Sequence, residues 1–357
     1  MDTLLSVIVI LLGLALVALS LASAFRTVVM PRAAFDPVTR AIFLGFRSFL
    51  LGLAKRTHYL DREVVLGAHA PLGLLTMALA WALGLIFGFS LIFTATGDVT
   101  FGRAVVLAGS SFTTLGFEAP AAPVHEALSV VAAILGLFIV ALLISYLPTI
   151  YGLFSRREVT VADVSIKSGG TAHGPDLVLH LTRAADTARL DDMWVDWGHW
   201  LITLGETHTS EPSLNFYRSP RVHRSWLNAA TAIIDAAALR NTLVAAPFSI
   251  RAEMTYRSGV EALAGIAHFF FVRPDVTDEH YSLLTRDDFD VEVARLEADA
   301  VPVVGNLDEA WAEFLELRKE YETYVLGLCE LILPPPAPWS SDLLERPRPP
   351  IPRRRRA

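Results

Sequence analysis

The hydrophobic positions of the chain concentrate in three long runs within the first half of the sequence. Residues 3 to 25, 67 to 97 and 127 to 154 contain no Asp, Glu, Lys or Arg, although His69 lies near the start of the second run. At 1.5 Å per residue the first run extends roughly 34 Å as a helix, which is enough to cross a bilayer. The pattern therefore predicts three transmembrane helices.

The direction of these helices follows from the basic residues beside them. The amino-terminal "MDT" carries no Lys or Arg, whereas basic residues follow the first run, among them Arg26, Arg32, Arg40, Arg47, Lys55 and Arg56. The positive-inside rule then places the amino terminus outside a cell membrane, segment 98–126 outside, and everything after residue 155 in the cytoplasm. A cleaved signal peptide is the alternative for residues 1–26, because "ALSLASAF" offers an Ala-x-Ala pattern, but the run is long for a signal.

The connection over residues 27–66 contains the amphipathic segment "DPVTRAIFLGFRSFLLGLAKR". Asp36 and Pro37 suit a helix start, and apolar residues recur at helical spacing, at Val38, Ile42, Phe46, Phe49 and Leu53. We expect a helix in the membrane interface. A buried soluble helix is the alternative.

A short polar stretch, "GSSFTTLGFEAP" at residues 109–120, interrupts the apolar part of the sequence. Residues 100–111 before it are typical of a short helix, with Thr100 as a candidate cap, and the prolines of "APAAP" prevent the helix from continuing. Irregular backbone at membrane depth is tolerated only where it is buried in protein or lines a water-filled path. The pattern therefore predicts a re-entrant helix followed by a loop.

Together, residues 67–155 resemble the pore module of two-transmembrane potassium-channel-like proteins. Thr114, Leu115, Gly116 and Phe117, preceded by Thr113, align with the family signature Thr-Val-Gly-Tyr-Gly, whose carbonyl oxygens replace the water around a potassium ion. The resemblance implies an ion-conducting filter from Thr113 to Glu118, through which K+ or another monovalent cation passes. It also implies a homotetramer, and no other metal or cofactor.

Two positions depart from that signature. Glu118 replaces the second glycine and Ala119 stands where an Asp is common, so either Glu118 has a different backbone conformation or the outermost ion site is altered. Four copies of Glu118 would surround the outer mouth, concentrate cations and titrate as a coupled set. The simpler alternative is a solvated loop acid.

Two residues of the third run are gating candidates. Gly136 lies about where similar channels have a flexible glycine, and Pro148 removes a backbone donor near the cytoplasmic end. Both residue types are also frequent in membrane helices for packing reasons.

The second half of the chain, residues 156–333, predicts a mainly helical cytoplasmic domain, so the expected fold class is all-α. "EVTVADVSI" at 158–166 alternates like a short strand or an extended linker. A later helix carries one apolar stripe, formed by Leu190, Trp194, Trp197, Leu201 and Leu204. We expect its Trp residues to lie in the core; the minor interpretation is an aromatic ligand-binding site. Trp311, Phe314, Leu317 and Tyr321 form the apolar face of a later helix. Residues 334–357, rich in Pro and Arg, predict a disordered tail whose Arg353–Arg356 cluster could touch anionic lipid.

Composition and motifs narrow the function further. The chain is 53% hydrophobic with a formal net charge of -7, which gives no reason to expect nucleic acid. The single Cys329 excludes an internal disulfide and is expected to be a packed thiol. His199 and His208 are expected to be satisfied or solvent-facing rather than metal ligands, and "RSPRVHRS" at 218–225 could hold an anion. No phosphate loop or nucleophile elbow is present, so an enzyme is not expected.

The sequence thus favours a subunit of a homotetrameric cation channel. The alternative is a non-conducting membrane scaffold or sensor that retains a degenerate pore module. A membrane enzyme has no residue constellation behind it, and a transporter of this kind would be expected to carry several pore repeats, whereas this sequence has one.

Overall fold

The computed structural model describes residues 3–30, 41, 45–46, 65–97, 99–120, 122–183, 187–272 and 282–346. In these residues the regular structure is helical, apart from an isolated bridge between Val244 and Val303. The chain divides into a first unit, Met1–Gly152, and a second unit, Leu153–Ala357. The all-α fold class is therefore confirmed for the described part of the chain.

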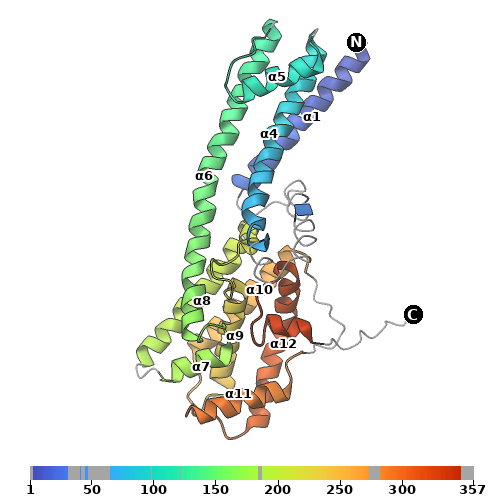
Figure 1. Ribbon diagram of the computed structural model, residues 1–357. Helices are drawn as coiled ribbons and strands as arrows, with labels where there is room; N and C mark the ends of the chain where they lie inside the picture. The colour runs from blue at the N-terminus through green and yellow to red at the C-terminus, as the bar shows by residue number, and fades with distance from the viewer. Residues whose placement is uncertain are drawn as a thin grey trace, which may run out of the picture. The chain divides into compact units, whose positions relative to one another are not determined.

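The first unit contains the apolar helices. They are α1 (Thr3–Val28), α4 (His69–Thr96), α5 (Phe101–Phe112) and the beginning of α6 (Pro123–Lys167) (Figure 1). Of these, α1, α4 and α6 are long and apolar enough to cross a membrane, which fits a membrane protein. Most of the 27–66 connection, including the expected interfacial helix, lies outside the described residues.

Small residues bring α1 and α4 into close contact. A Cβ added to Gly13 would lie 2.6 Å from the carbonyl oxygen of Gly88, and one added to Gly88 would lie 2.7 Å from Val17 Cγ2. Trp81 on α4 donates its indole N–H to Ser23 Oγ on α1 at 2.9 Å. Small-residue contacts and buried polar bonds are how helices associate within a membrane, where lipid is as apolar as Leu.

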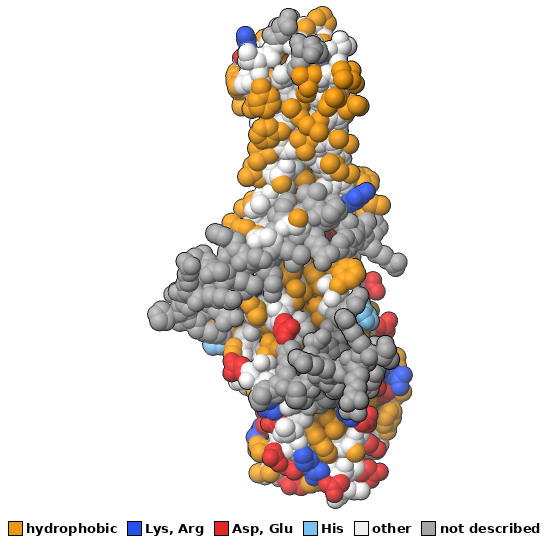
Figure 2. All heavy atoms as spheres, turned by 90° about the vertical axis from the view of Figure 1, so that its right-hand side faces the viewer, with side chains coloured by type: hydrophobic (Ala, Val, Ile, Leu, Met, Phe, Trp, Pro, Cys, Tyr) orange, Lys and Arg blue, Asp and Glu red, His pale blue; other side chains and the backbone are white. Residues whose placement is uncertain are grey.

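The outward side chains of the first unit suit a lipid environment. Many Leu, Ile and Val residues of α1, α4 and α6 are exposed, among them Leu4, Leu11, Leu75 and Ile144. On the face drawn in Figure 2, hydrophobic side chains are frequent over the upper part, with few charged side chains among them, whereas most charged side chains lie in the lower part.

Helix α5 packs between its neighbours through a small apolar cluster. Phe89 and Phe93 of α4, Ala104, Leu107 and Ala108 of α5, and Ala132 of α6 form this cluster. With 12 residues, α5 is only about 18 Å long and is too short to cross a bilayer.

Helix α6 continues without interruption to Lys167, so the expected strand or linker at 158–166 is wrong. Val161 and Val164, three positions apart, are both buried in the core of the second unit. Burial of one helical face against other helices outweighs the weak β preference of the Val and Thr residues in this segment.

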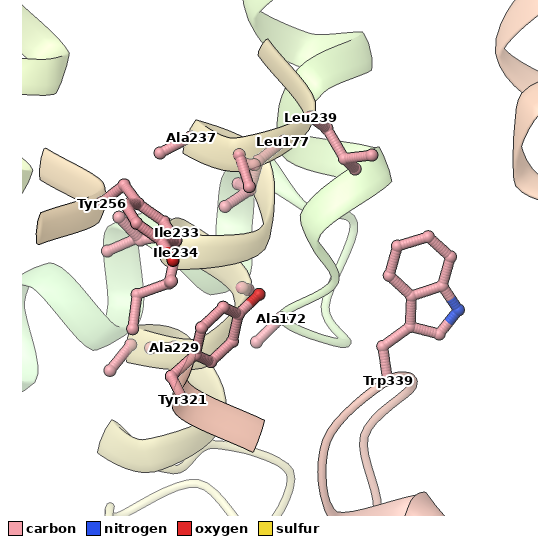
Figure 3. Close-up of a cluster of buried hydrophobic side chains, with 14 of the residues drawn as sticks. Ala172, Leu177, Ala229, Ile233, Ile234, Ala237, Leu239, Tyr256, Tyr321 and Trp339 are labelled. Carbon is pink, nitrogen blue, oxygen red and sulfur yellow. The ribbon is translucent and has the colours of Figure 1, made fainter. Parts of the chain in front are cut away.

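The second unit is built around α9 (Trp226–Thr242), of whose 17 residues all but Arg240 and Asn241 are buried. A helix that is buried on almost every side lies at the centre of a protein core. Around it lie α7 (Gly174–Arg183), α8 (Thr187–Ser210), η1 (Pro212–Phe216), α10 (Ile250–Phe269), α11 (Arg286–Ala298), α12 (Leu307–Ile332) and η2 (Ser341–Glu345). Figure 3 shows Tyr256 and Tyr321 beside Ile233 and Ile234 of α9.

The aromatic stripe of α8 belongs to this core, as expected. Trp194, Trp197, Leu201 and Leu204 are buried, while the side chain of Leu190 lies outside the described residues. Cys329 is also buried, and burial raises the pKa of its thiol to about 12, so it remains a packed, unreactive thiol.

The folded second unit extends further than the sequence indicates, because residues 334–346 are not a disordered tail. Trp339 is buried against His173 and Phe314, with ring centroids 5.2 and 5.7 Å away. Asn228 Nδ2 donates to the carbonyl oxygen of Pro335 at 2.9 Å. Residues 347–357, with the Arg353–Arg356 cluster, lie outside the described part of the chain.

Candidate functional site

The candidate site is the loop that follows α5 and contains the expected filter residues. Helix α5 begins after Thr100, which occupies the N-cap position but makes no side-chain capping bond, and ends at Phe112. Thr113 Oγ1 donates to the carbonyl oxygen of Gly109 at 2.7 Å. The Thr113 hydroxyl proton is therefore used within α5, and its oxygen lone pairs remain available as acceptors.

The loop folds back onto the last turn of α5. The N–H groups of Leu115 and Gly116 both donate to the carbonyl oxygen of Ser110, at 3.0 and 3.4 Å. The Glu118 N–H donates to Ser110 Oγ at 3.3 Å. These bonds fix residues 115–118 to the helix end, so the loop backbone is held in place by the preceding helix α5.

Two loop residues adopt left-handed backbone conformations. Gly116 has φ +67° and Thr114 has φ +60°. A left-handed conformation costs a non-glycine residue about 1–2 kcal/mol. Such local strain typically occurs at functional sites, where the surrounding contacts maintain it.

Glu118 stands where the family signature has its second glycine. Its φ is not positive, so its backbone is not in the left-handed conformation that favours glycine. Its carboxylate accepts a bond from Arg103 Nε on the first turn of α5, with Oε1 at 2.6 Å. The exposed fractions of the side chains are 70% for Arg103 and 22% for Glu118, so Glu118 is a paired, partly covered acid rather than a fully solvated one.

The apolar side chains of the loop point away from the protein in a single chain. Leu115 and Phe117 are 70% and 66% exposed. With these side chains facing outward, the loop presents backbone and hydroxyl oxygens together with unpartnered apolar surface. Oxygen ligands of this kind suit a monovalent cation, and the apolar surface suits a neighbouring protein chain.

Gly136 lies where α6 approaches the end of α5. A Cβ at this position would overlap the carbonyl oxygen of Phe112 and would lie 3.0 Å from the Phe112 carbonyl carbon. The packing explanation of this glycine is therefore supported by a specific contact directly before the loop. Pro148 lies inside the uninterrupted α6.

A buried histidine connects the ends of α4 and α6 and was not identified from the sequence. His125 Nε2 lies 3.1 Å from Thr96 Oγ1, and Thr96 Oγ1 donates its only proton to the carbonyl oxygen of Ile92 at 2.7 Å. Nε2 must therefore donate to Thr96, and Nδ1 is buried without a hydrogen-bond partner among the described residues. Gly97 is required here, because a Cβ would lie 2.6 Å from His125 Cε1.

In the second unit, Arg157 forms a buried cluster where α6 enters the helical core. Its Nη1 donates to the carbonyl oxygen of Leu214 at 2.8 Å and its Nη2 to that of Tyr217 at 2.7 Å. Nη1 also lies 3.3 Å from His208 Nε2. Burial and the Arg157 charge hold the His208 pKa well below its usual value, so His208 is a neutral, satisfied histidine, as expected.

A second buried ionic cluster joins α9, α12 and the 334–346 segment. Arg318 donates to Asp235, to the Trp339 carbonyl oxygen, and to Glu322 Oε2 at 2.8 Å; Tyr321 also donates to Asp235. Burial raises the pKa of Asp235, although the Arg318 charge opposes this shift. Removing one member of such a cluster leaves a buried charge uncompensated, so we assign it a structural role.

The remaining histidine candidate does not belong to a metal site in the described part of the chain. His199 is exposed on α8, and in the described part of the chain no three His, Cys, Asp or Glu residues gather in a group that could hold a metal ion. No protein-family model matches the sequence, and no curated protein or solved structure matches it significantly.

Proposed function

We propose that this protein is one subunit of a homotetrameric, potassium-channel-like cation channel. In this proposal, α5 is a re-entrant pore helix, and the Thr113–Glu118 loops of four subunits line the narrow part of the pore. Ions pass down their gradient between backbone carbonyl and hydroxyl oxygens of these loops.

The observation that carries the proposal is the polar loop bonded to the end of α5. Three N–H groups of residues 115–118 bond to Ser110, and Gly116 has the left-handed backbone that the family resemblance calls for. The loop lies between two helices long enough to cross a membrane. A polar loop in that setting needs either protein or a water-filled path around it.

A ring of copies meets this requirement. One loop can line only one side of an axis, and closed symmetric assemblies are the usual way for identical chains to surround one. The exposed Leu115 and Phe117 side chains then pack against neighbouring protein. The carboxyl-terminal end of α5 carries about half a negative charge, which favours a cation near the loop.

The Arg103–Glu118 ion pair sets the charge at the outer mouth. Four Glu118 carboxylates alone would place four negative charges there, but each is paired within its own subunit at 2.6 Å. The mouth of the proposed pore therefore has little net charge, and cation selection depends on the loop oxygens rather than on an acidic ring.

In the proposed topology, the amino terminus is outside the cell membrane and the second unit is cytoplasmic. This follows from the basic residues after α1 and from Arg156 and Arg157 after the third apolar run. Pro148 lies near the cytoplasmic end of that run and remains a gating candidate.

Cation flux into proteoliposomes tests the function. We expect K+ uptake with purified wild-type protein, and loss of uptake in Gly116→Ala, because a Cβ at φ +67° is strained although no neighbouring atom lies within 4 Å of it. Gly102→Ala is the matched control, since Gly102 lies on α5, also has nothing within 4 Å and has no positive φ.

Two results would contradict the proposal. One is that neither K+ nor Na+ enters wild-type proteoliposomes that contain correctly folded tetramers, a result that would favour the non-conducting scaffold. The other is a monomer or dimer in detergent, because neither can enclose a pore between its loops.

A further inference from the structure

An exposed basic surface lies beside α6 where the third apolar run ends. Phe154 is the last residue of the uncharged run, and the exposed Arg156 follows it. If α6 crosses the membrane, the residues packed against Phe154 and Arg157 lie close to the lipid headgroups.

The loop between η1 and α9 is held at this position by direct contacts. The Tyr217 ring lies 5.5 Å from the Phe154 ring, and Arg157 donates to the carbonyl oxygens of Leu214 and Tyr217. Tyr217 thus packs against the last residue of the third apolar run. Tyr, with an apolar ring and a polar hydroxyl, is typical of the membrane interface.

The continuation of this loop is basic. Arg221 and Arg224 are brought together by a turn in which the Arg224 N–H donates to the Arg221 carbonyl oxygen at 3.0 Å, and the exposed His223 lies between them. Arg218 serves a different purpose, because it donates to the carbonyl oxygens of Ile332 and Leu333 at the end of α12.

The positive charges of this surface have no acidic partner in the part of the chain that the structure describes. Among the described residues, no Asp or Glu lies within ion-pair distance of Arg156, Arg221 or Arg224. The neighbouring Glu158 is already bound by Arg157, at 2.8 Å. Three arginines therefore remain available to an outside anion.

We propose that Arg156, Arg221 and Arg224 form a binding surface for the headgroup of an anionic phospholipid in the leaflet next to the end of α6. Guanidinium groups bind phosphate with well-defined hydrogen-bond geometry, and a bilayer places a phosphate at this depth. A lipid is the chosen occupant because the loop is fixed to α6 at the point where the apolar run ends. This surface is independent of the Arg353–Arg356 cluster.

The size of the effect follows from the number of charges. Each Arg near an anionic membrane surface strengthens binding by roughly fivefold. Neutralising all three therefore weakens headgroup binding by on the order of 10²-fold, and the loss shrinks as salt screens the charges.

The test measures binding of short-chain lipids to the detergent-purified full chain by thermophoresis. We expect dioctanoylphosphatidylglycerol to bind at least tenfold more tightly than zwitterionic dioctanoylphosphatidylcholine. We expect the variant Arg156→Gln/Arg221→Gln/Arg224→Gln to lose on the order of 10²-fold in phosphatidylglycerol affinity. The assay does not depend on ion conduction, so a failed flux experiment leaves this inference intact.

The matched control removes three arginines elsewhere on the second unit. Arg183→Gln/Arg251→Gln/Arg257→Gln changes the net charge equally, and all three side chains are at least 45% exposed. Unfolding midpoints in detergent confirm that both variants are folded. Equal losses in the two variants, equal binding of the two lipids, or inorganic phosphate binding as tightly as phosphatidylglycerol would each overturn the proposal.

Discussion

Gly136→Ala tests whether this glycine holds α6 against the end of α5 or acts as a hinge. The added Cβ would lie 3.0 Å from the Phe112 carbonyl carbon, whereas carbon atoms in good contact are about 3.5–4.0 Å apart. The helices must therefore separate by roughly 0.5–1 Å. Phe112 directly precedes Thr113, so the separation displaces the start of the loop.

The magnitude follows from two opposing effects. Overpacking of this kind costs about 1–3 kcal/mol, whereas Ala is favoured over Gly inside a helix by about 1 kcal/mol. Gly152→Ala, on the same helix, gains the second effect without the first, because nothing lies within 4 Å of its Cβ position. The two variants should therefore differ by about 1–3 kcal/mol, with Gly136→Ala the less stable.

Thermal unfolding in detergent and K+ flux in proteoliposomes provide the two readouts. We expect a lower unfolding midpoint for Gly136→Ala than for Gly152→Ala, and reduced flux because the loop has moved. Equal midpoints would refute the packing argument. A changed probability of opening with unchanged stability would support the hinge instead.

Three further predictions concern the second unit. Arg157→Met leaves the Tyr217 carbonyl oxygen without its donor, while the Leu214 carbonyl oxygen keeps the Tyr217 N–H at 3.2 Å, so the unfolding free energy should fall by about 1–3 kcal/mol. Arg156→Met on the exposed neighbour should change the unfolding free energy little in chemical denaturation. The Arg346 guanidinium lowers the Asp288 pKa to about 2, so this ion pair contributes its full stability above about pH 4 and loses it as the pH falls toward 2. Arg346→Gln should therefore weaken the dependence of the unfolding free energy on pH in that range, and an unchanged dependence would contradict the assignment. Trp339→Ala should cost about 3–5 kcal/mol and release the 334–346 segment to limited proteolysis, and a segment that remains resistant would show that other contacts hold it.

The long helices could be predicted from the sequence because their signal is local. Three runs without Asp, Glu, Lys or Arg predicted α1, α4 and the apolar part of α6, and a short apolar segment predicted α5 to within one residue at each end. The Trp stripe of α8 likewise indicated a core-facing helix, and its residues are buried. Helical periodicity and the absence of charge need no knowledge of distant residues.

The errors occurred where distant contacts decide the conformation. Residues 158–166 alternate like a strand, yet Val161 and Val164 are buried on a helix against the core of the second unit. The Pro-rich residues after 333 resemble a tail, yet Arg318, Asn228 and Phe314 hold them through Trp339 and Pro335. In both cases the partners are far away in the sequence, so no local pattern indicates them.

The sequence by itself determined that three apolar helices and one short polar-ended helix form the first part of this protein, because backbone hydrogen bonding and burial of apolar side chains require it. Only the tertiary structure decided that Glu118 is paired with Arg103, that Gly136 contacts Phe112, and that Arg157 fixes a basic loop beside α6. Each of these contacts joins residues that share no helical or strand spacing. Their geometry depends on how whole helices pack, and that is a property of the folded chain.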